Sequence, residues 1–194
     1  GKLAAGFIRG AEGEGVGTSL KHFAVNNQET LRMSVSAEVD ERALHELYLR
    51  PFEIAVKEGA PSTVMCRYNR INGVYASENR MLLTRILREQ WGFDGLVMSD
   101  WGAVYRRPAG VAAGLDLEMP SSGGVTDREI VRAGRGGAGR AVRPGAAPGA
   151  GPCAAAQKGV SRARAPCGGG APHAGQAPRA GRARRAGERR AAEE

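Results

Sequence analysis

The last third of this 194-residue sequence lacks nearly every side chain that builds a protein core. From residue 131 onward there is no Leu, Ile, Met, Phe, Tyr, Trp, Asp, Asn or Thr, and most residues are Ala, Gly, Arg or Pro. Such a segment buries too little apolar surface to offset the chain entropy that folding removes. We therefore expect one globular part, residues 1–130, followed by a disordered low-complexity tail, residues 131–194.

Three interpretations of this tail are open. The codon boxes of Ala, Gly, Arg and Pro begin with two G or C bases, so a GC-rich gene read in a shifted frame yields this mixture. A disordered linker and an arginine-rich arm that binds nucleic acid also fit the composition. We favour the shifted frame. The coding DNA tests it, because another frame near codon 131 then continues the fold.

The front part of the chain has no excess of basic charge. Residues 131–194 contain 13 basic and 3 acidic residues, a net charge of +10, whereas residues 1–130 contain 15 basic and 17 acidic residues, a net charge of −2. Proteins that bind nucleic acid present clustered basic residues. We expect no nucleic-acid partner for residues 1–130.

Cysteine and long apolar runs are also scarce. The three cysteines, Cys66, Cys153 and Cys167, show no metal-ligand spacing and no disulfide framework. We expect neither a metal site nor a cofactor. No signal peptide or membrane-spanning run is present, which favours a cytoplasmic protein without membrane contact. The first residue is Gly1 instead of Met, so we expect that the natural N-terminus is missing, and export stays open.

What residues 1–130 do contain is an alternation of strand-like and helix-like patterns. Strand patterns cover residues 19–25, 62–69, 96–98 and 112–120, and amphipathic helix patterns cover residues 40–59 and 78–91. In the first helix Pro51 predicts a kink or a break. Residues 126–130 resemble the beginning of a third helix.

Strands that alternate with helices in this way are parallel and joined by right-handed crossovers. The predicted fold class is therefore α/β. Four strands are half of an eight-stranded barrel, which leaves an open edge. We expect an incomplete (β/α)8 barrel of the TIM type, roughly its second half.

The strand at residues 96–98 leads to the most informative polar group. Its apolar run lies between glycines, is typical of a strand buried on both faces, and is followed by Ser99, Asp100 and Trp101. Chemistry in β/α barrels is placed at the carboxyl ends of the strands. Asp100 is a candidate nucleophile there, and Trp101 a candidate platform for a sugar ring. The alternative is that Asp100 only caps the next element.

Polar groups follow the other predicted strands too. They are Lys21 and His22, Tyr68 and Asn69, and Asp116 and Glu118, with Arg32 after the first strand. A pyranose needs hydrogen-bond donors, an aromatic face and an acid near its anomeric carbon. Each residue alone also has a structural interpretation: a solvated lysine, a core histidine or a core tyrosine ring.

Four stretches of the sequence resemble glycoside hydrolase family 3, in particular its β-glucosidase branch. They are KHFAVNNQET (21–30), MCRYNRING (65–73), WGFDGLVMSDWGA (91–103) and GLDLEMP (114–120). The related N-acetylglucosaminidase branch carries Lys-His-Phe-Pro-Gly-His-Gly where this chain continues with Ala24-Val25-Asn26-Asn27. This difference favours the β-glucosidase branch.

The resemblance implies a retaining β-glycosidase that acts on a small β-glucoside or oligosaccharide. It implies that Asp100 is the nucleophile, that Tyr68 lies beside it, and that Trp101 forms part of the wall of the sugar subsite. It also implies three donors to the sugar hydroxyls: Lys21, His22 and Arg32.

Two parts of the family's site are expected to lie outside this sequence. In the family, an Asp and an Arg from earlier barrel strands also bind the sugar, and the general acid/base is a Glu from a second, C-terminal domain. No residue after Ile130 resembles that domain. We therefore expect this chain alone to be inactive. The alternative is a degenerate, non-catalytic homologue that binds carbohydrate weakly.

Overall fold

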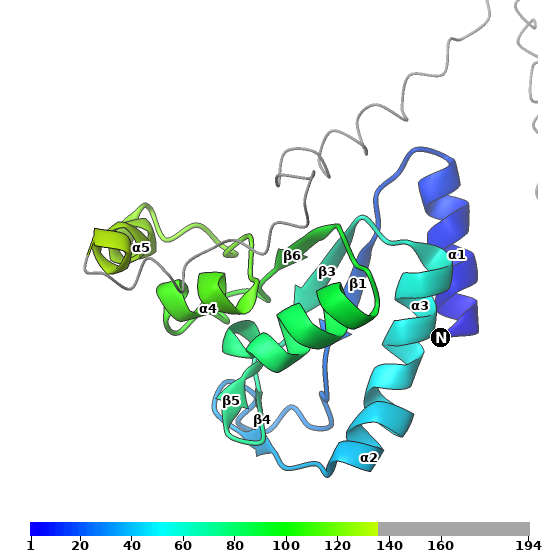
Figure 1. The fold of residues 1–194 in the computed structure, drawn as a ribbon, viewed down its shortest axis with the longest axis horizontal. Helices are drawn as coiled ribbons and strands as arrows, with labels where there is room; N and C mark the ends of the chain where they lie inside the picture. The colour runs from blue at the N-terminus through cyan, green and yellow to red at the C-terminus, as the bar shows by residue number, and fades with distance from the viewer. Residues whose placement is uncertain (136–194) are drawn as a thin grey trace, which may run out of the picture.

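A parallel three-stranded sheet forms the centre of the computed structural model, which describes residues 1–135 (Figure 1). Its strands lie in the order β1-β3-β6, with β1 at Ser19–Phe23, β3 at Thr63–Cys66 and β6 at Leu96–Met98. The predicted α/β class with parallel strands is confirmed. The predicted last strand is reduced to one parallel bridge, which joins Leu117 to Met98.

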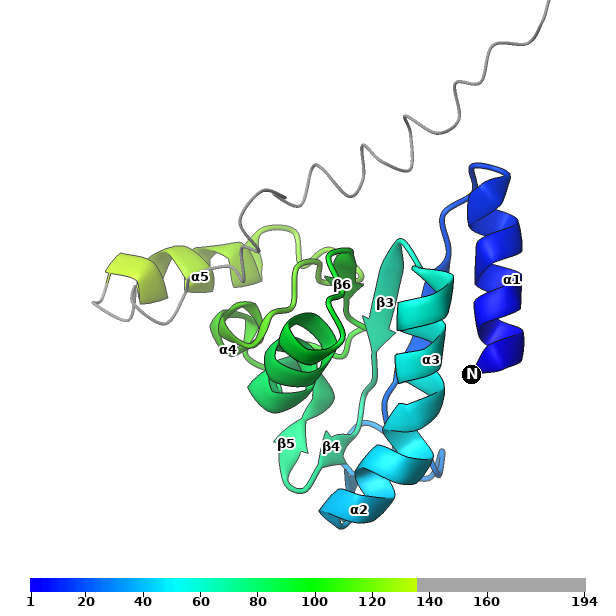
Figure 2. The same ribbon diagram turned by 45° about the vertical axis from the view of Figure 1, so that its right-hand side comes forward.

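Helical segments lie before, between and after these strands (Figures 1 and 2). They are α1 (Lys2–Gly13), α2 (Glu41–Ala43), the π-helical η1 (Leu44–Leu49), α3 (Arg50–Gly59), the 3-10 turn η2 (Ala76–Glu78), the π-helical η3 (Met81–Gln90), α4 (Arg107–Ala113) and α5 (Val125–Arg135). Both views place α1 beside α3. The third helix, whose beginning was predicted at residues 126–130, is α5. It extends beyond residue 130, where the globular part was predicted to end.

A second, smaller sheet lies next to the carboxyl ends of β1 and β3. It consists of β2 (Ser36–Ala37), which is parallel to β4 (Arg70–Ile71), and of β5 (Val74–Tyr75), which is antiparallel to β4. The turn between β4 and β5 has positive φ angles at Asn72 (48°) and Gly73 (84°), as a tight hairpin requires. The Asn-Gly pair was correctly interpreted as a turn, but the hairpin around it was not predicted.

The apolar core lies between the sheet and its helices. Phe23 at the end of β1 contacts Phe52 of α3 edge-on, with ring centroids 5.2 Å apart, and Trp91 at 5.8 Å. Val64 and Val97, which are paired neighbours on β3 and β6, are fully buried. These contacts fix the strands against the helices and therefore fix where the strands end.

The helix predicted at residues 40–59 is continuous in the structure. Asp40 begins it by accepting a hydrogen bond from the Ala43 N–H. A π-helical stretch precedes Pro51, and the chain passes the proline in this wider turn instead of breaking. Gly59 ends the helix as predicted, and Ala60 takes the left-handed conformation (φ 53°).

Two helices, α1 and α4, were not predicted. Helix α1 contains glycines that weaken a helical pattern, and it is stabilised by tertiary packing of Ala5 and Ile8 on α3. Helix α4 is short and contains Pro108 and Gly110, two poor helix formers. The predicted disordered tail lies outside the described residues, apart from residues 131–135.

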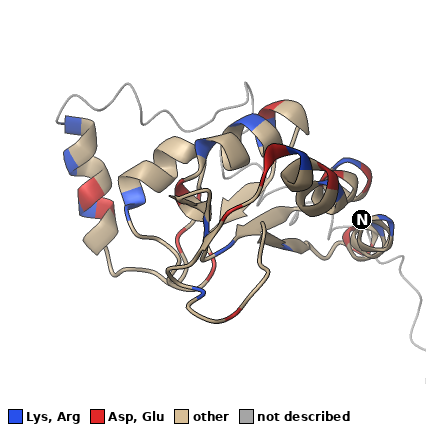
Figure 3. Ribbon diagram, turned by 90° about the horizontal axis from the view of Figure 1, so that it is seen from below, with Lys and Arg blue, Asp and Glu red and all other residues tan. Residues whose placement is uncertain are grey.

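Acidic and basic residues both occur along several of the helices (Figure 3). Arg128, Arg132 and Arg135 give α5 its basic character, with Asp127 and Glu129 between and beside them. Within residues 1–135, no helix combines the length and the apolar composition that crossing a membrane requires.

Candidate active site

The carboxyl ends of β1, β3 and β6 meet at one edge of the sheet. Backbone hydrogen bonds continue the parallel pairing just past the strands: the Arg67 N–H donates to the Phe23 carbonyl and the Asp100 N–H donates to the Cys66 carbonyl, each at 3.1 Å. The residues that follow the three strands are therefore neighbours in space. This is the arrangement that a barrel uses for its chemistry.

Asp100 is buried at this edge and uses its two carboxylate oxygens differently. Oδ1 accepts a hydrogen bond of 2.7 Å from the Trp101 N–H. Oδ2 is buried and has no hydrogen-bond partner among the residues that the structure describes. The next helix, α4, begins at Arg107 with Arg106 at its N-cap, so Asp100 does not cap it. The capping alternative is wrong.

His22 lies directly against the free oxygen of Asp100. Its Nε2 is 3.5 Å from Asp100 Oδ2, and its side chain is 29% exposed. Burial lowers the pKa of His22 below 6.5 and outweighs the raising effect of Asp100, while Arg67 and Lys21 lower it further. The imidazole is therefore neutral at neutral pH and carries both a donor and an acceptor nitrogen.

Tyr68 lies under Arg32 and beside Asp100. The Arg32 guanidinium carbon is 4.8 Å from the centre of the Tyr68 ring, a cation–π distance. Burial raises the pKa of the Tyr68 phenol, and the Asp100 carboxylate raises it further. Tyr68 is therefore a protonated, hydrogen-bonding phenol at the edge where Asp100 lies.

The other two predicted residues are on the surface. Trp101 follows Asp100 and is 63% exposed. Lys21 is exposed on β1, and no hydrogen bond joins it to Asp100 among the described residues. Among the described residues, the basic side chains within 4 Å of the Asp100 carboxylate are those of His22 and Arg67.

Sequence reasoning missed Arg67 and Glu29. Arg67 Nη2 donates to Glu29 Oε1 at 2.7 Å, and Arg67 Nη1 is 3.8 Å from Asp100 Oδ2. The available signal was the position of Arg67, directly after the strand run and before Tyr68. Its partner is 38 residues away in sequence, which periodicity does not reveal.

Asp116 and Glu118 take part in structural interactions instead. The Asp116 carboxylate accepts hydrogen bonds from Arg88 (2.6 Å) and from the Val97 N–H (2.8 Å). Glu118 accepts one from the Thr126 hydroxyl. These two carboxylates hold the segment after β6 in place and are not free for chemistry.

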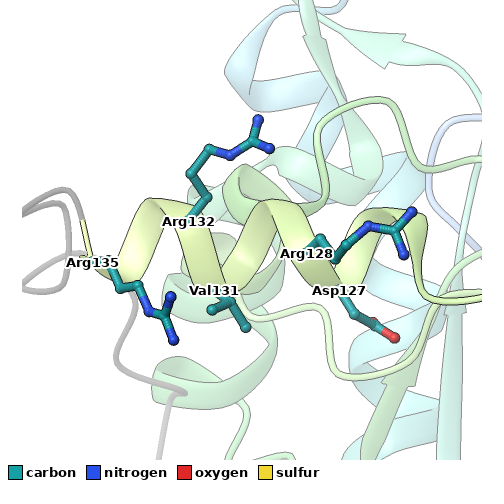
Figure 4. Close-up of a pocket in the computed structure, with 5 residues that line it drawn as sticks. All are labelled: Asp127, Arg128, Val131, Arg132 and Arg135. Carbon is teal, nitrogen blue, oxygen red and sulfur yellow. The ribbon is translucent and has the colours of Figure 1, made fainter.

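The hollow drawn in Figure 4 is elsewhere on the molecule. It lies along α5 and is lined by Asp127, Arg128, Val131, Arg132 and Arg135. None of these residues belongs to the three strand ends described above. The candidate active site is thus distinct from this hollow.

A comparison with protein families identifies the family to which this chain belongs. The model of the glycosyl hydrolase family 3 N terminal domain matches residues 1–127. The chain belongs to glycosyl hydrolase family 3. The resemblance inferred from the four sequence motifs is confirmed.

Relatives within family 3 are similar over the same region. Thermostable beta-glucosidase B of Acetivibrio thermocellus is 58% identical over 132 residues, which are 68% of this chain and 18% of that protein. An exo-alpha-(1->6)-L-arabinopyranosidase of Bifidobacterium longum is 56% identical over 137 residues, 71% of this chain and 18% of that protein.

Solved family 3 structures agree with the fold. The β-glucosidase of Bifidobacterium adolescentis aligns with a TM-score of 0.71 at 48% identity and covers 81% of this chain and 23% of its own. β-Glucosidase 3B of Thermotoga neapolitana in complex with alpha-D-glucose aligns with a TM-score of 0.69 at 44% identity, over 72% of this chain and 21% of its own. The chain spans about a fifth of the length of these relatives.

Proposed function

We propose that residues 1–130 supply the nucleophile and part of the sugar-binding site of a retaining β-glycosidase that acts on β-glucosides. They form roughly the second half of a (β/α)8 barrel in this proposal. The remaining strands and the acid/base carboxyl group come from other parts of the complete enzyme. Family membership and the glucose bound in the Thermotoga neapolitana structure support a carbohydrate substrate.

The free oxygen of Asp100 is the observation that carries the proposal. A buried carboxylate oxygen without a hydrogen bond is uncommon and requires a reason. Attack on an anomeric carbon supplies one, because the attacking oxygen needs a lone pair that no hydrogen bond occupies. His22 and Tyr68 at the same edge are suited to donate hydrogen bonds to the sugar hydroxyls.

The proposed reaction has two steps. Asp100 Oδ2 forms a bond to C1 of the sugar while the bond from C1 to the leaving oxygen breaks and the acid/base carboxyl protonates that oxygen. Water then attacks C1, gives its proton to the acid/base, and the electron pair of the C1–Oδ2 bond returns to Asp100. Two carboxyl groups about 5–5.5 Å apart are needed for this chemistry.

A second candidate class of substrate is the α-L-arabinopyranosides. The Bifidobacterium longum relative named as an arabinopyranosidase is almost as similar to this chain as the relative named as a β-glucosidase. Residues 1–130 therefore suit a pyranoside glycone in either enzyme. An assay on aryl β-glucosides and aryl α-L-arabinopyranosides separates the two.

The experiment uses a hybrid enzyme, in which residues 1–127 of this chain replace the matching residues of thermostable beta-glucosidase B. We expect the hybrid enzyme to hydrolyse aryl β-glucosides. Asp100→Asn removes the charged nucleophile and lowers kcat by about 10⁴-fold or more. Equal activity of the hybrid enzyme with Asp100 and with Asn at this position contradicts the proposal.

The same experiment addresses the non-catalytic alternative. A degenerate homologue gives a folded hybrid enzyme that binds glucose but does not hydrolyse aryl glycosides of either class. Circular dichroism establishes folding, and calorimetric titration with glucose measures binding.

A further inference from the structure

Arg67 has its guanidinium buried between two carboxylates. Its Nη2 donates to Glu29 Oε1 at 2.7 Å, and its Nη1 is 3.8 Å from Asp100 Oδ2. Arg67 is only 3% exposed. Because a buried charge is costly unless it is paired, this placement depends chiefly on the hydrogen-bonded pair with Glu29.

Glu29 is a fixed anchor for this arginine. Its carboxylate also accepts hydrogen bonds of 3.0 Å from Asn26 and from Arg32. The hydrogen bonds from Asn26 and Arg32, with a smaller one from Arg67, lower the pKa of Glu29 to about 2. Charges therefore alternate along the row Arg32, Glu29, Arg67, Asp100, and Glu29 stays anionic throughout the neutral range.

Arg67 faces the oxygen that the proposed reaction uses. Asp100 Oδ1 is already held by the Trp101 N–H, so Oδ2 is the oxygen that bonds to C1. Oδ2 loses its negative charge when the glycosyl-enzyme forms and regains it when water releases the sugar. A cation beside Oδ2 stabilises the charged form of the carboxylate and so favours its departure from C1.

Resting on the function proposed above, we infer that Arg67 is a positioning residue that acts through Asp100 to accelerate the second step. In that step water bonds to C1, the C1–Oδ2 bond breaks with its electron pair going to Asp100, and the acid/base carboxylate takes the proton. Arg67 stabilises the departing carboxylate and keeps it in place for the next turnover. Glu29 holds Arg67 in position.

The kinetic test compares the hybrid enzyme with its Arg67→Met variant on 2,4-dinitrophenyl β-glucoside, whose leaving group makes the first step fast. We expect the second step to slow by about tenfold or more. The glycosyl-enzyme then accumulates, so a burst of dinitrophenol precedes the steady state, and kcat and KM fall together. A merely structural role lowers the fraction of active enzyme without lowering KM.

Arg107→Met is the matched control. Arg107 is 7% exposed and its Nε is 3.8 Å from Glu118 Oε2, so it has similar burial and the same ion-pair distance, with a different carboxylate. We expect no change in burst or KM for this variant. Arg67→Lys keeps the charge but not the fork that reaches both carboxylates, and we expect an intermediate effect.

Glu29→Gln keeps the inference testable if Arg67→Met does not fold. Glu29 is 62% exposed, so its substitution spares the core, and we expect a burst and a lower KM, both smaller than for Arg67→Met. In the full 194-residue chain, the urea midpoints of Arg67→Met, Asp100→Asn and the double variant are expected to be non-additive, because the two residues interact.

The failures of the two proposals are distinguishable. An active Asp100→Asn hybrid enzyme overturns the proposed function, whatever Arg67 does. An inactive Asp100→Asn hybrid enzyme, together with an Arg67→Met variant that has no burst and an unchanged KM, overturns the role of Arg67. If Arg67→Met does not fold, a Glu29→Gln variant without a burst overturns it.

Discussion

The two ends of the parallel sheet each hold a carboxylate, and the two are used in opposite ways. At the amino ends of β1 and β3, Glu12 accepts four hydrogen bonds of 2.8 Å, from the backbone and hydroxyl groups of Thr18 and Ser62. At the carboxyl ends, Asp100 leaves one buried oxygen without a hydrogen bond among the described residues. A satisfied carboxylate stabilises the fold, whereas an unsatisfied one is available for chemistry.

The largest expected effect on stability is at the satisfied end. Glu12→Ala leaves the N–H groups of Thr18 and Ser62 without their acceptor, and we expect it to cost about 2–4 kcal/mol in the free energy of unfolding. Urea unfolding of the full chain measures this. Asp100→Asn is the contrasting variant, and we expect a change below about 1 kcal/mol. A larger loss for Asp100→Asn than for Glu12→Ala contradicts the comparison.

The stabilisation that Glu12 provides is expected to depend on pH. Burial opposes ionisation of Glu12, but the hydrogen bonds from Thr18 and Ser62 lower its pKa below 4.5. A carboxyl with a lowered pKa in the folded state stabilises the fold above pH 4.5, and this contribution is lost as the pH falls through the lowered pKa. We expect the stability difference between the chain and Glu12→Gln to be largest near pH 7 and to shrink below pH 4.5. A difference that is constant with pH speaks against the role of the charge.

The smallest expected effect concerns the exposed indole of Trp101, at the carboxyl ends of the strands. Trp101→Ala removes a stacking surface worth about 0.5–1.5 kcal/mol, so we expect KM of the hybrid enzyme for aryl β-glucosides to rise about two- to tenfold. The value of kcat changes less, because Trp101 does not contact the free oxygen of Asp100 through a side-chain hydrogen bond. Steady-state kinetics measure both, and an unchanged KM removes Trp101 from the subsite.

Much of the arrangement at the carboxyl ends of the strands could be predicted from the sequence. The strand before Asp100 is a short apolar run between glycines, and the polar residues after it lie at the carboxyl end of a parallel strand in any α/β arrangement. For the same reason His22 and Tyr68 were expected near Asp100, and they lie there.

The interactions around Glu12 and Asp100 could not be predicted from the sequence. Glu12 bonds to Ser62, 50 residues away, and Arg67 bonds to Glu29, 38 residues away. Such contacts depend on how α1 and the loop after β1 fold back onto the sheet, which the local residue pattern does not specify. Helix α1 in particular is rich in glycine, so its packing on α3, not its propensity, determines that it is helical.

The identity of the nucleophile is the central claim, and covalent labelling tests it most directly. A 2-deoxy-2-fluoro-β-glucoside with a dinitrophenolate leaving group traps the glycosyl-enzyme, because the fluorine slows its hydrolysis. Proteolysis and mass spectrometry of the labelled hybrid enzyme then locate the sugar. We expect one fluoroglucosyl group, on Asp100. A label on Glu29, Asp116 or Glu118, with Asp100 unmodified, contradicts the account.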